Sequence, residues 1–519
     1  MQIWEILDHA ARLYGQSEAF VCGETRLSYA RVFERVRRLA AGLLALGPAP
    51  GDRIGVIMPN CHRYSELYFA ADYAGLVLTP LNHRLAPAEV AYILNHAEAS
   101  ALVLGPEYAA AYDAYVPELE TAGHIVWSRA SDGRPGALYE DLIAGNDPLP
   151  RPARERGEND LAQLYYTSGT TGNPKGAMLS ERNVADTALL NIISTGLGAA
   201  DTYLRCAPAF HLADAWANFA VTLAGGRHVV IPEFNPQAFM EAVQRERVTL
   251  TLVVPTMIDA LVNWPRVHEY DSSSLRAILF GASPMPGDRL KAAMQTFACE
   301  LTQWYGMTEA YPAVSYMPGR GLDPDGPPEV ARRILSCGRQ AAGVQVRVVN
   351  EAGDEVRPGE VGEILIKGPN VMLGYWKRPD ATAEALRGGW MHSGDAATVD
   401  DAGYIYIVDR LKDMIISGGE NIYSTEVEDV LYRHPAVLEC AVIGVPDEQW
   451  GERVHAIVAL RPGQTATAED LIEFSRTQIG HYKCPRSLAF IDALPKTGSG
   501  KIQKAALREP FWAGKERRV

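Results

Sequence analysis

The chain has 519 residues, 47% of them hydrophobic, with 49 basic and 63 acidic side chains. This length exceeds what one hydrophobic core serves, so we expect two or more domains. The formal net charge of -14 argues against a nucleic-acid partner, because neutralising a phosphate backbone needs clustered Lys and Arg. The net charge does not exclude small charged ligands, since the charges of a local site can oppose the field of the whole protein.

Cysteines and apolar stretches indicate the cellular setting. The seven cysteines are scattered and none is paired at CxxC spacing, a pattern typical of reduced thiols and not of disulfides or zinc. The first residues include Glu5 and Asp8, where a signal peptide needs a basic and then an unbroken apolar region. The most apolar stretch, residues 250–262, is interrupted by Pro255 and Asp259 and is shorter than the roughly 20 residues of a membrane span. We expect a soluble, cytoplasmic protein without an integral membrane segment.

The first three fifths of the chain alternate apolar runs with helical patterns, which predicts parallel β–α units. Before the middle of this part, strands are predicted at residues 53–58, 76–80 and 101–104, and helices at 64–73 and 88–96. Further along, strands are predicted at residues 227–231, 249–254 and 275–280, and a helix at 236–247. The fold class is therefore α/β, with doubly wound sheets in a large N-terminal domain.

The pattern changes from about residue 343. Strands with short turns are predicted at residues 344–349, 362–367 and 404–408, which favours an antiparallel or β-barrel-like subdomain.

A new β–α pattern follows Asp409, and in it Thr425 and Glu428 have the spacing of a helix capping box. We predict a large N-terminal domain of residues 1–409 and a separate small α+β domain of residues 410–519.

Residues 166–176, Tyr-Thr-Ser-Gly-Thr-Thr-Gly-Asn-Pro-Lys-Gly, contain the densest ligand-binding chemistry. Their hydroxyls offer hydrogen bonds, their glycines let the backbone approach a ligand, and Lys175 adds a positive charge, which suits a triphosphate. A Walker loop would need glycine in place of Pro174 and Ser or Thr in place of Gly176, so a P-loop NTPase is disfavoured. A plain surface turn is the weaker alternative.

Two further loops are expected near this one. Residues 281–284 follow the strand predicted at 275–280, and residues 305–309 are also expected at the end of a strand. In doubly wound sheets ligands bind beyond the carboxyl ends of strands, so we expect all three loops to converge on one site.

Eight motifs in this order resemble the superfamily of adenylate-forming enzymes, which includes acyl-CoA and aryl-CoA synthetases, luciferases and adenylation domains of peptide synthetases. The motifs span nearly the whole chain, at residues 166–176, 210–211, 281–283, 305–309, 392–395, 409–413, 417–421 and 495–501. The resemblance implies a reaction in which a carboxylate attacks the α-phosphate of Mg-ATP to give an acyl-adenylate, whose acyl group a thiol then takes. ATP, Mg²⁺ and coenzyme A are the implied cofactor and co-substrates.

The resemblance also implies site residues. It assigns catalytic roles to Lys501, Thr308, Glu309 and His211, and metal binding to Glu309 and Thr170. It assigns ATP binding to Thr167, Ser168, Gly169, Thr170, Thr171, Gly172, Lys175, Gly281, Ala282, Ser283, Tyr305, Gly306, Asp395 and Arg410. Among these, Tyr305 would stack on adenine, and Asp395 and Arg410 would bind the ribose hydroxyls. From periodicity alone Lys501 is an ordinary surface lysine, and only the resemblance gives it a role.

The second half-reaction is implied to need a rotation of the small domain about a hinge at Lys412. Coenzyme A would then contact Gly418, Gly419, Trp450 and Arg486, with Tyr482 nearby. Glycines suit this position because a pantetheine arm can pass close to bare backbone.

The acyl pocket is assigned to His211, Trp216, Met307 and Tyr311, although aromatic and Met side chains at such spacing are as often plain core. None of these side chains is a cationic partner for a second carboxylate, so the predicted function is an ATP-dependent acid–CoA ligase for a hydrophobic monocarboxylate, with a fatty acid favoured slightly over an aromatic one. An acyl-AMP ligase that loads a carrier protein and a non-catalytic nucleotide-binding protein of the same fold remain alternatives. A homodimer is left open.

Overall fold

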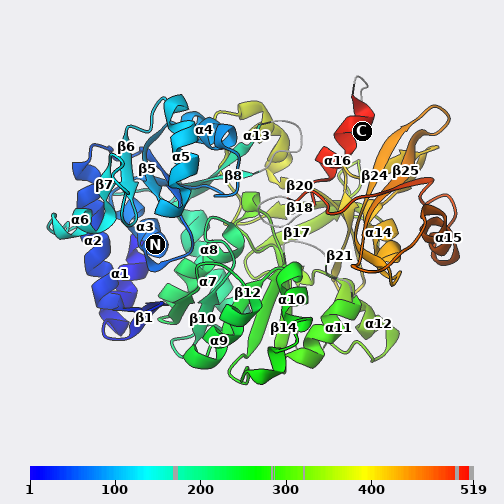
Figure 1. The fold of residues 1–519 in the computed structure, drawn as a ribbon, viewed down its shortest axis with the longest axis horizontal. Coiled ribbons are helices and arrows are strands. Elements are labelled where there is room, and N and C mark those ends of the chain that lie inside the picture. Colours follow the sequence, from blue (N-terminus) through cyan, green and yellow to red (C-terminus); the bar gives the residue numbers. More distant parts are fainter. Residues whose placement is uncertain (168–172, 282–284, 286, 320–321, 497–501, 514–519) are drawn as a thin grey trace. The chain divides into compact units, whose positions relative to one another are not determined.

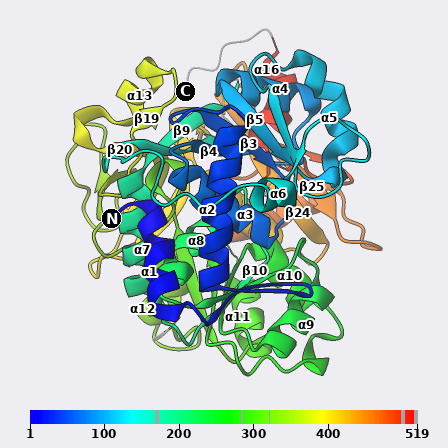
Figure 2. The same ribbon diagram turned by 90° about the vertical axis from the view of Figure 1, so that its left-hand side faces the viewer.

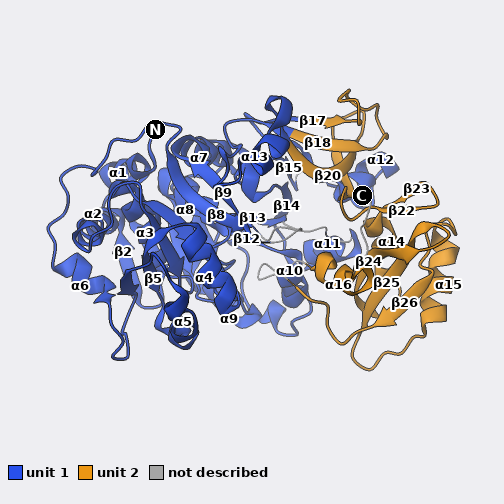
Figure 3. Ribbon diagram, turned by 90° about the horizontal axis from the view of Figure 1, so that it is seen from above, with its two compact units in different colours: residues 1–346, 366–391 blue, residues 347–365, 392–519 orange. Residues whose placement is uncertain are grey.

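The computed structural model describes residues 1–167, 173–281, 285, 287–319, 322–496 and 502–513. Contacts within the chain divide it into two compact units, residues 1–346 with 366–391 and residues 347–365 with 392–519 (Figure 3). The predicted boundary between residues 409 and 410 marks where the small domain would rotate, which is a different property from compactness, and this boundary stays a prediction. In the described part of the chain, no helix combines the length and the apolar character that crossing a membrane requires.

The first unit contains a nine-stranded sheet that is parallel at its centre (Figure 1). Its strands in spatial order are β16 (Arg339–Gln340), β15 (Ser315–Met317), β14 (Glu300–Tyr305), β13 (Ala277–Gly281), β12 (Leu250–Val253), β10 (Thr202–Arg205), β11 (Arg227–Val230), β1 (Glu18–Cys22) and β2 (Thr25–Ser28). Helices that belong to this half of the unit are α7 (Glu181–Thr195), α8 (Leu212–Leu223), α9 (Pro236–Glu246), α10 (Pro255–Val262), α11 (Gly287–Thr296) and α12 (Pro328–Ala331).

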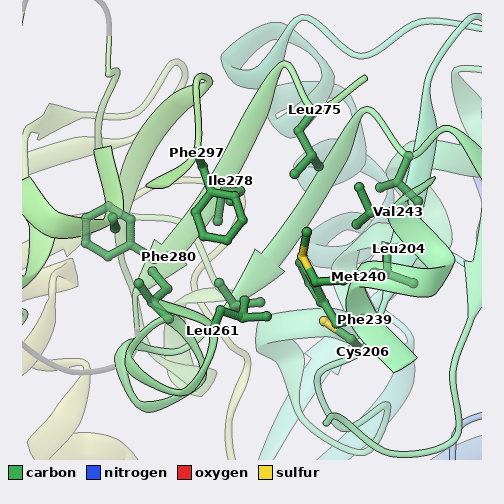
Figure 4. Close-up of a cluster of buried hydrophobic side chains, with 14 of the residues drawn as sticks. Leu204, Cys206, Phe239, Met240, Val243, Leu261, Leu275, Ile278, Phe280 and Phe297 are labelled. Carbon is green, nitrogen blue, oxygen red and sulfur yellow. The ribbon is translucent and has the colours of Figure 1, made fainter. Parts of the chain in front are cut away.

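A buried apolar cluster fills the space between this sheet and its helices. Figure 4 shows Leu204, Ile278 and Phe280 of the strands facing Phe239 and Met240 of α9. The strands read as nearly continuous apolar runs because both of their faces are covered, as parallel sheets require.

The second sheet of this unit has eight strands. In spatial order they are β19 (Gly374–Tyr375), β9 (Lys175–Ser180), β8 (Leu161–Thr167), β4 (Val77–Pro80), β3 (Arg53–Ile57), β5 (Ala99–Leu104), β6 (His124–Trp127) and β7 (Ala137–Leu138). The connecting helices are α3 (His62–Tyr73), α4 (Pro87–His96), α5 (Ala109–Tyr115) and α6 (Tyr139–Ala144), and α13 (Pro379–Ala385) follows β19. The predicted doubly wound α/β fold is confirmed, and the predicted strands and helices agree with the observed ones to within a few residues.

The predicted barrel-like subdomain is observed as a four-stranded sheet of order β17 (Gln345–Val349), β18 (Gly362–Lys367), β20 (Met391–Val399) and β21 (Ile405–Arg410). β20 and β21 pair antiparallel, as expected from the short turn between them.

The C-terminal part of the second unit is an α+β domain with a five-stranded sheet. Its strands are β23 (Glu420–Ile422), β22 (Ile415–Ser417), β25 (Gly451–Leu460) and β24 (Val437–Asp447), with β26 (Ser487–Phe490) paired to β25. Its helices are α14 (Ser424–Tyr432), α15 (Ala468–Gln478) and α16 (Lys504–Trp512).

The capping box predicted at Thr425 and Glu428 is wrong. The residue before α14 is Tyr423, which makes no side-chain cap. The Thr425 hydroxyl donates to the Val408 carbonyl, and the Glu428 carboxylate accepts the Val442 amide at 2.7 Å. Both side chains form hydrogen bonds with partners distant in the sequence, which the spacing alone could not reveal.

The N-terminal helices α1 (Ile3–Tyr14) and α2 (Tyr29–Ala45) lie side by side in Figure 2, and buried carboxylates hold the start of α1. The Ile3 amide donates to Glu181 at 2.9 Å and the Trp4 amide to Asp72 at 2.8 Å, which satisfies donors that a helix start leaves unpaired. Arg156 lies between the two carboxylates, at 3.1 Å from Asp72 and 2.9 Å from Glu181. All three charged side chains are at most 3% exposed.

Replacing this arginine should destabilise the first unit strongly. Arg156→Met leaves two buried carboxylates without a cation, a change that costs about 3–5 kcal/mol in comparable sites. Burial, followed by the charge of Glu181, already raises the pKa of Asp72. When folding raises the pKa of a carboxyl, the folded state loses stability as pH rises toward that pKa. The loss of stability caused by Arg156→Met should therefore be larger at pH 8 than at pH 5.

Scanning calorimetry at the two pH values measures this effect. Arg182→Ala is the matched control, because its pair with Asp186 at 3.3 Å is exposed and is worth less than about 1 kcal/mol. Equal losses of stability in Arg156→Met and Arg182→Ala would show that Arg156 does not compensate buried carboxylates.

Candidate active site

The two ends of the predicted phosphate loop face each other across an antiparallel pair of strands. Thr167 ends β8, Lys175 begins β9, and the two residues are in register. The Thr167 hydroxyl donates to the Lys175 carbonyl at 3.5 Å. The loop is therefore the connection of a hairpin whose base is fixed. The other predicted loop residues, Ser168, Gly169, Thr170, Thr171 and Gly172, lie outside the described residues.

The two other predicted loops leave neighbouring parallel strands. β13 ends at Gly281 and β14 at Tyr305, and Gly281 is in register with Trp304. A Cβ atom at Gly281 would lie 2.2 Å from the Trp304 carbonyl oxygen, so only glycine fits there. The buried Tyr305, the predicted adenine contact, is thus held at a strand end as doubly wound folds require. Ala282 and Ser283 lie outside the described residues.

Gly306 allows the chain after β14 to fold back on itself. A Cβ atom at this position would lie 1.1 Å from the Pro312 carbonyl oxygen, and the Val314 amide donates to the Tyr305 carbonyl at 2.9 Å. A short 3-10 turn, Thr308–Ala310, sits at the tip of this loop and carries the predicted catalytic pair Thr308 and Glu309.

Glu309 is 9% exposed and has a tyrosine partner. The Tyr375 hydroxyl donates to Glu309 Oε1 at 3.0 Å. Burial raises the pKa of Tyr375, followed by the neighbouring charge of Glu309, so the phenol keeps its proton. The ring of the same tyrosine lies 5.1 Å from Lys175 Nζ. Sequence reasoning missed Tyr375, and the signal is three-dimensional, because it arises from the pairing of β19 with β9.

The predicted acyl-pocket residues have different surroundings. His211 precedes α8, and its Nδ1 accepts the Ala213 amide at 3.1 Å. Trp216 is fully buried, with its ring centroid 4.9 Å from that of Trp304, and Tyr311 is 1% exposed. Both aromatic side chains are buried, and their assignment to the acyl pocket stays a prediction. Met307 is half-buried and lies in the chain between β14 and the 3-10 turn Thr308–Ala310.

Within the second unit, the two residues predicted to hold the ribose are neighbours. Asp395 and Arg410 are directly opposite on β20 and β21, and the guanidinium lies 3.6 Å from the carboxylate. The backbone joins the same place, since the Leu411 amide donates to the Gly394 carbonyl at 2.9 Å. The geometry fixes a carboxylate and a cation side by side, which suits recognition of hydroxyl groups.

The predicted coenzyme A contacts also gather within this unit. Gly418 and Gly419 form the turn between β22 and β23 with positive φ angles of 62° and 84°. A Cβ atom at Gly418 would lie 2.6 Å from the Trp450 ring, and the guanidinium of Arg486 lies 4.6 Å from the centroid of that ring. Glycine is therefore needed at 418 partly to accommodate the tryptophan. Tyr482 is 49% exposed.

The predicted catalytic lysine, Lys501, lies outside the described residues. Lys496 and Ile502, on either side of that segment, form an isolated antiparallel bridge.

A magnesium ion fits the donor chemistry around Glu309. No group of three or more His, Cys, Asp or Glu side chains in the described ranges could hold a metal by itself. Mg²⁺ in nucleotide-dependent enzymes needs only one or two carboxylates, because phosphate oxygens and water complete its coordination. The single buried carboxylate of Glu309 is consistent with that mode. The second predicted ligand, Thr170, lies outside the described residues.

Comparisons with known proteins identify the class. Residues 7–376 match the AMP-binding enzyme family, and residues 426–501 match the AMP-binding enzyme C-terminal domain. The chain is 43% identical to the feruloyl-CoA synthase of an Amycolatopsis species, over 96% of this chain and 97% of the relative. It is 35% identical to the indoleacetate–CoA ligase of Aromatoleum aromaticum, over 98% of each chain.

Solved structures agree. An anthranilate CoA ligase in complex with anthranoyl-AMP superimposes with a TM-score of 0.88 and 25% identity, covering 98% of this chain and 97% of the other. The o-succinylbenzoate CoA synthetase of Bacillus subtilis, in complex with its acyl-adenylate intermediate, gives a TM-score of 0.85 and 27% identity over 98% of each chain. The chain therefore belongs to the AMP-binding enzyme family, in the acid–CoA ligase branch of the adenylate-forming enzymes. It is an acid–thiol ligase that uses ATP and coenzyme A, as the motifs predicted.

Gly306→Ala should damage the nucleotide site while leaving most of the fold intact. The added methyl group overlaps the Pro312 carbonyl, so the loop that carries Glu309 must move. We expect ATP affinity to fall at least about tenfold, since displacement of a binding loop removes several contacts at once. Titration calorimetry measures the affinity. Gly198→Ala, where no atom lies within 4 Å of the added Cβ, is the control. Unchanged affinity in Gly306→Ala would show that this loop does not contribute to the site.

The amine of Lys412, the predicted hinge residue, should have a pKa below that of an ordinary lysine. Burial, followed by the neighbouring Arg410, lowers the pKa of Lys412 to about 8. Competitive acylation of the folded protein, read by mass spectrometry at successive pH values, should therefore give a midpoint near pH 8 for this amine. A midpoint near the ordinary lysine value of 10.5 would show that burial does not lower the pKa of this amine.

Proposed function

We propose that this ligase activates an aromatic monocarboxylic acid and transfers it to coenzyme A. The observation that carries the proposal is the 43% identity, over 96% of the chain, to a feruloyl-CoA synthase. The 35% identity to an indoleacetate–CoA ligase, which is named for an aromatic acid, supports the same class. This choice reverses the slight preference for fatty acids that the sequence motifs gave.

In the first step the carboxylate oxygen attacks the α-phosphorus of ATP, and pyrophosphate leaves with the electron pair of the broken P–O bond. Both reactants are anionic, so the site must supply positive charge and donors. Thr167 and Lys175 at the base of the loop would hold the β- and γ-phosphates. Lys501 would bridge the acid and the α-phosphate, a role that suits a compact charge on a flexible stem.

Other residues would orient the nucleotide. Tyr305 at the end of β14 would stack on adenine, and the pair Asp395 and Arg410 would bind the ribose hydroxyls. Glu309, with Thr308 beside it, would hold Mg²⁺ and face the α-phosphate. Bound magnesium would neutralise charge on the phosphates as the P–O bond breaks.

In the second step the thiol sulfur of coenzyme A attacks the acyl carbon, and AMP leaves. We propose that rotation of the small domain about Lys412 brings the turn at Gly418 and Gly419 to the acyl-adenylate. The Trp450 and Arg486 pair would then contact the nucleotide part of coenzyme A, because a guanidinium stacked on an aromatic ring offers both a cation and a flat surface.

A fatty acid is the second candidate substrate. The chain is 33% identical over 99% of its length to a medium/long-chain-fatty-acid–CoA ligase of Mycobacterium tuberculosis. A carrier protein as the acyl acceptor has a parallel in a fatty acid–acyl-carrier-protein ligase of Streptomyces coeruleorubidus, at 34% identity. A cytoplasmic location and a homodimer stay predictions from the sequence.

Acid-dependent release of pyrophosphate separates these candidates. Hydroxycinnamates, benzoates, indoleacetate and fatty acids of increasing chain length are each assayed with ATP and Mg²⁺, with and without coenzyme A. We expect hydroxycinnamates to give a kcat/KM at least about tenfold above any fatty acid, the order of discrimination that a shaped apolar pocket provides. AMP formation should require coenzyme A.

The other outcomes are equally informative. A preference for fatty acids would reject the aromatic proposal and support the second candidate. Release without use of coenzyme A, but with transfer to a carrier protein, would indicate an acyl-AMP ligase. ATP binding without release from any acid would leave a non-catalytic nucleotide-binding protein.

A further inference from the structure

One short segment, residues 370–376, connects the loop that carries Glu309 with the strand that begins at Lys175. We call it the bridging segment. On one side, its Met372 amide donates to the Glu309 carbonyl at 2.9 Å, and its Asn370 side chain donates to the Ala310 carbonyl at 2.9 Å. On the other side, the Leu373 amide donates to Met178 at 2.9 Å and the Trp376 amide to Gly176 at 2.8 Å.

Within this segment a single side chain contacts both charged groups. The Tyr375 hydroxyl donates to Glu309 Oε1 at 3.0 Å, and the Tyr375 ring centroid lies 5.1 Å from Lys175 Nζ. The main chain of the tyrosine is itself held, because its amide donates to the Thr382 hydroxyl at 2.8 Å. The ring therefore lies between an acid and a base with its position fixed from both ends.

We propose that Tyr375 is a positioning residue, which orients the Glu309 carboxylate for the metal–nucleotide complex and holds the Lys175 ammonium for the phosphates. The inference rests on the roles given to Glu309 and Lys175 in the proposed function. It adds a residue that none of the eight motifs contains.

The physical reason is that each target would otherwise be loosely oriented. A carboxylate on a short turn can rotate about its last bond, and a phenol that donates to Oε1 fixes which oxygen, Oε2, is presented to a cation. Partners that hold a metal-binding carboxylate in this way typically change metal affinity by about 10- to 100-fold when removed. The face of the ring attracts the ammonium group and limits the many rotamers of the lysine.

Tyr375→Phe separates the two functions of the tyrosine, because it removes the hydroxyl and keeps the ring. Mn²⁺, as a probe for Mg²⁺, is titrated into the full-length protein with saturating ATP and no acid, and free Mn²⁺ is read by electron paramagnetic resonance. We expect the Kd for Mn²⁺ to rise about tenfold. ATP affinity in the presence of a chelator should stay within about twofold, since Lys175 keeps its aromatic partner.

Tyr375→Leu removes the ring as well. We expect the same loss of Mn²⁺ affinity and, in addition, a weaker binding of metal-free ATP by about threefold or more. In the pyrophosphate assay, Tyr375→Phe should raise the Mg²⁺ concentration for half-maximal rate more than it lowers the limiting rate.

Tyr139→Phe is the matched control. The Tyr139 hydroxyl also donates from a buried ring to a carboxylate, Glu66, at 2.8 Å, but it belongs to α6, away from the predicted loops. It should lower thermal stability to a similar extent without changing Mn²⁺ affinity. Unchanged Mn²⁺ affinity in Tyr375→Phe, or an equal change in Tyr139→Phe, would overturn the inference. Failure of the proposed function looks different, because it shows in the wild-type protein, either as a preference for fatty acids or as no pyrophosphate release from any acid.

Discussion

The pairing of β8 with β9 and of β9 with β19 is the constraint on which the first unit's site depends. β8 pairs parallel with β4 and antiparallel with β9, so Thr167 and Lys175 lie opposite each other at the carboxyl end of β8. β19, from much later in the chain, pairs antiparallel with β9. Hydrogen bonds between main-chain groups thus fix the positions of Lys175 and Tyr375, and only the side chains are left to carry chemistry.

Glycines in this region are required by backbone contacts as much as by a ligand. Gly281 and Gly306 lie where carbonyl oxygens of Trp304 and Pro312 leave no room for a Cβ atom. Both contacts tighten the chain around the end of β14, so the loop with Glu309 can curve back within a few residues. In the second unit, Gly418 similarly accommodates Trp450. The resemblance assigned Gly281 and Gly306 to ATP binding and Gly418 to coenzyme A binding, and the structure adds close packing within the protein itself.

The order of strands and helices could be predicted because apolar runs and helical periodicity are local properties. The strand at residues 362–367 was predicted to the residue. The capping box at Glu428 failed because that carboxylate has distant partners, the Val442 amide and Lys504, both at 2.7 Å. Tyr375 was missed for the same reason, since its contacts come from strand pairing. The role of Lys501 rests on the resemblance alone, and that of the loop residues 168–172 on the resemblance and on their hydroxyls and glycines, because all of these residues lie outside the described part of the chain.

Buried charges also explain how the second unit can remain rigid near its predicted hinge. Arg508 of α16 donates to the Lys412 carbonyl at 3.3 Å and pairs with Asp413 at 3.1 Å. Lys504, one turn earlier, pairs with Glu428 at 2.7 Å, and burial raises the pKa of that carboxyl to about 7. Removing one partner from such a pair leaves an uncompensated buried charge, which costs more than the pair contributes when intact. α16 is therefore attached by ionic contacts to Asp413 and to Glu428 of α14. A rotation at Lys412 would then carry α16 with the rest of the small domain.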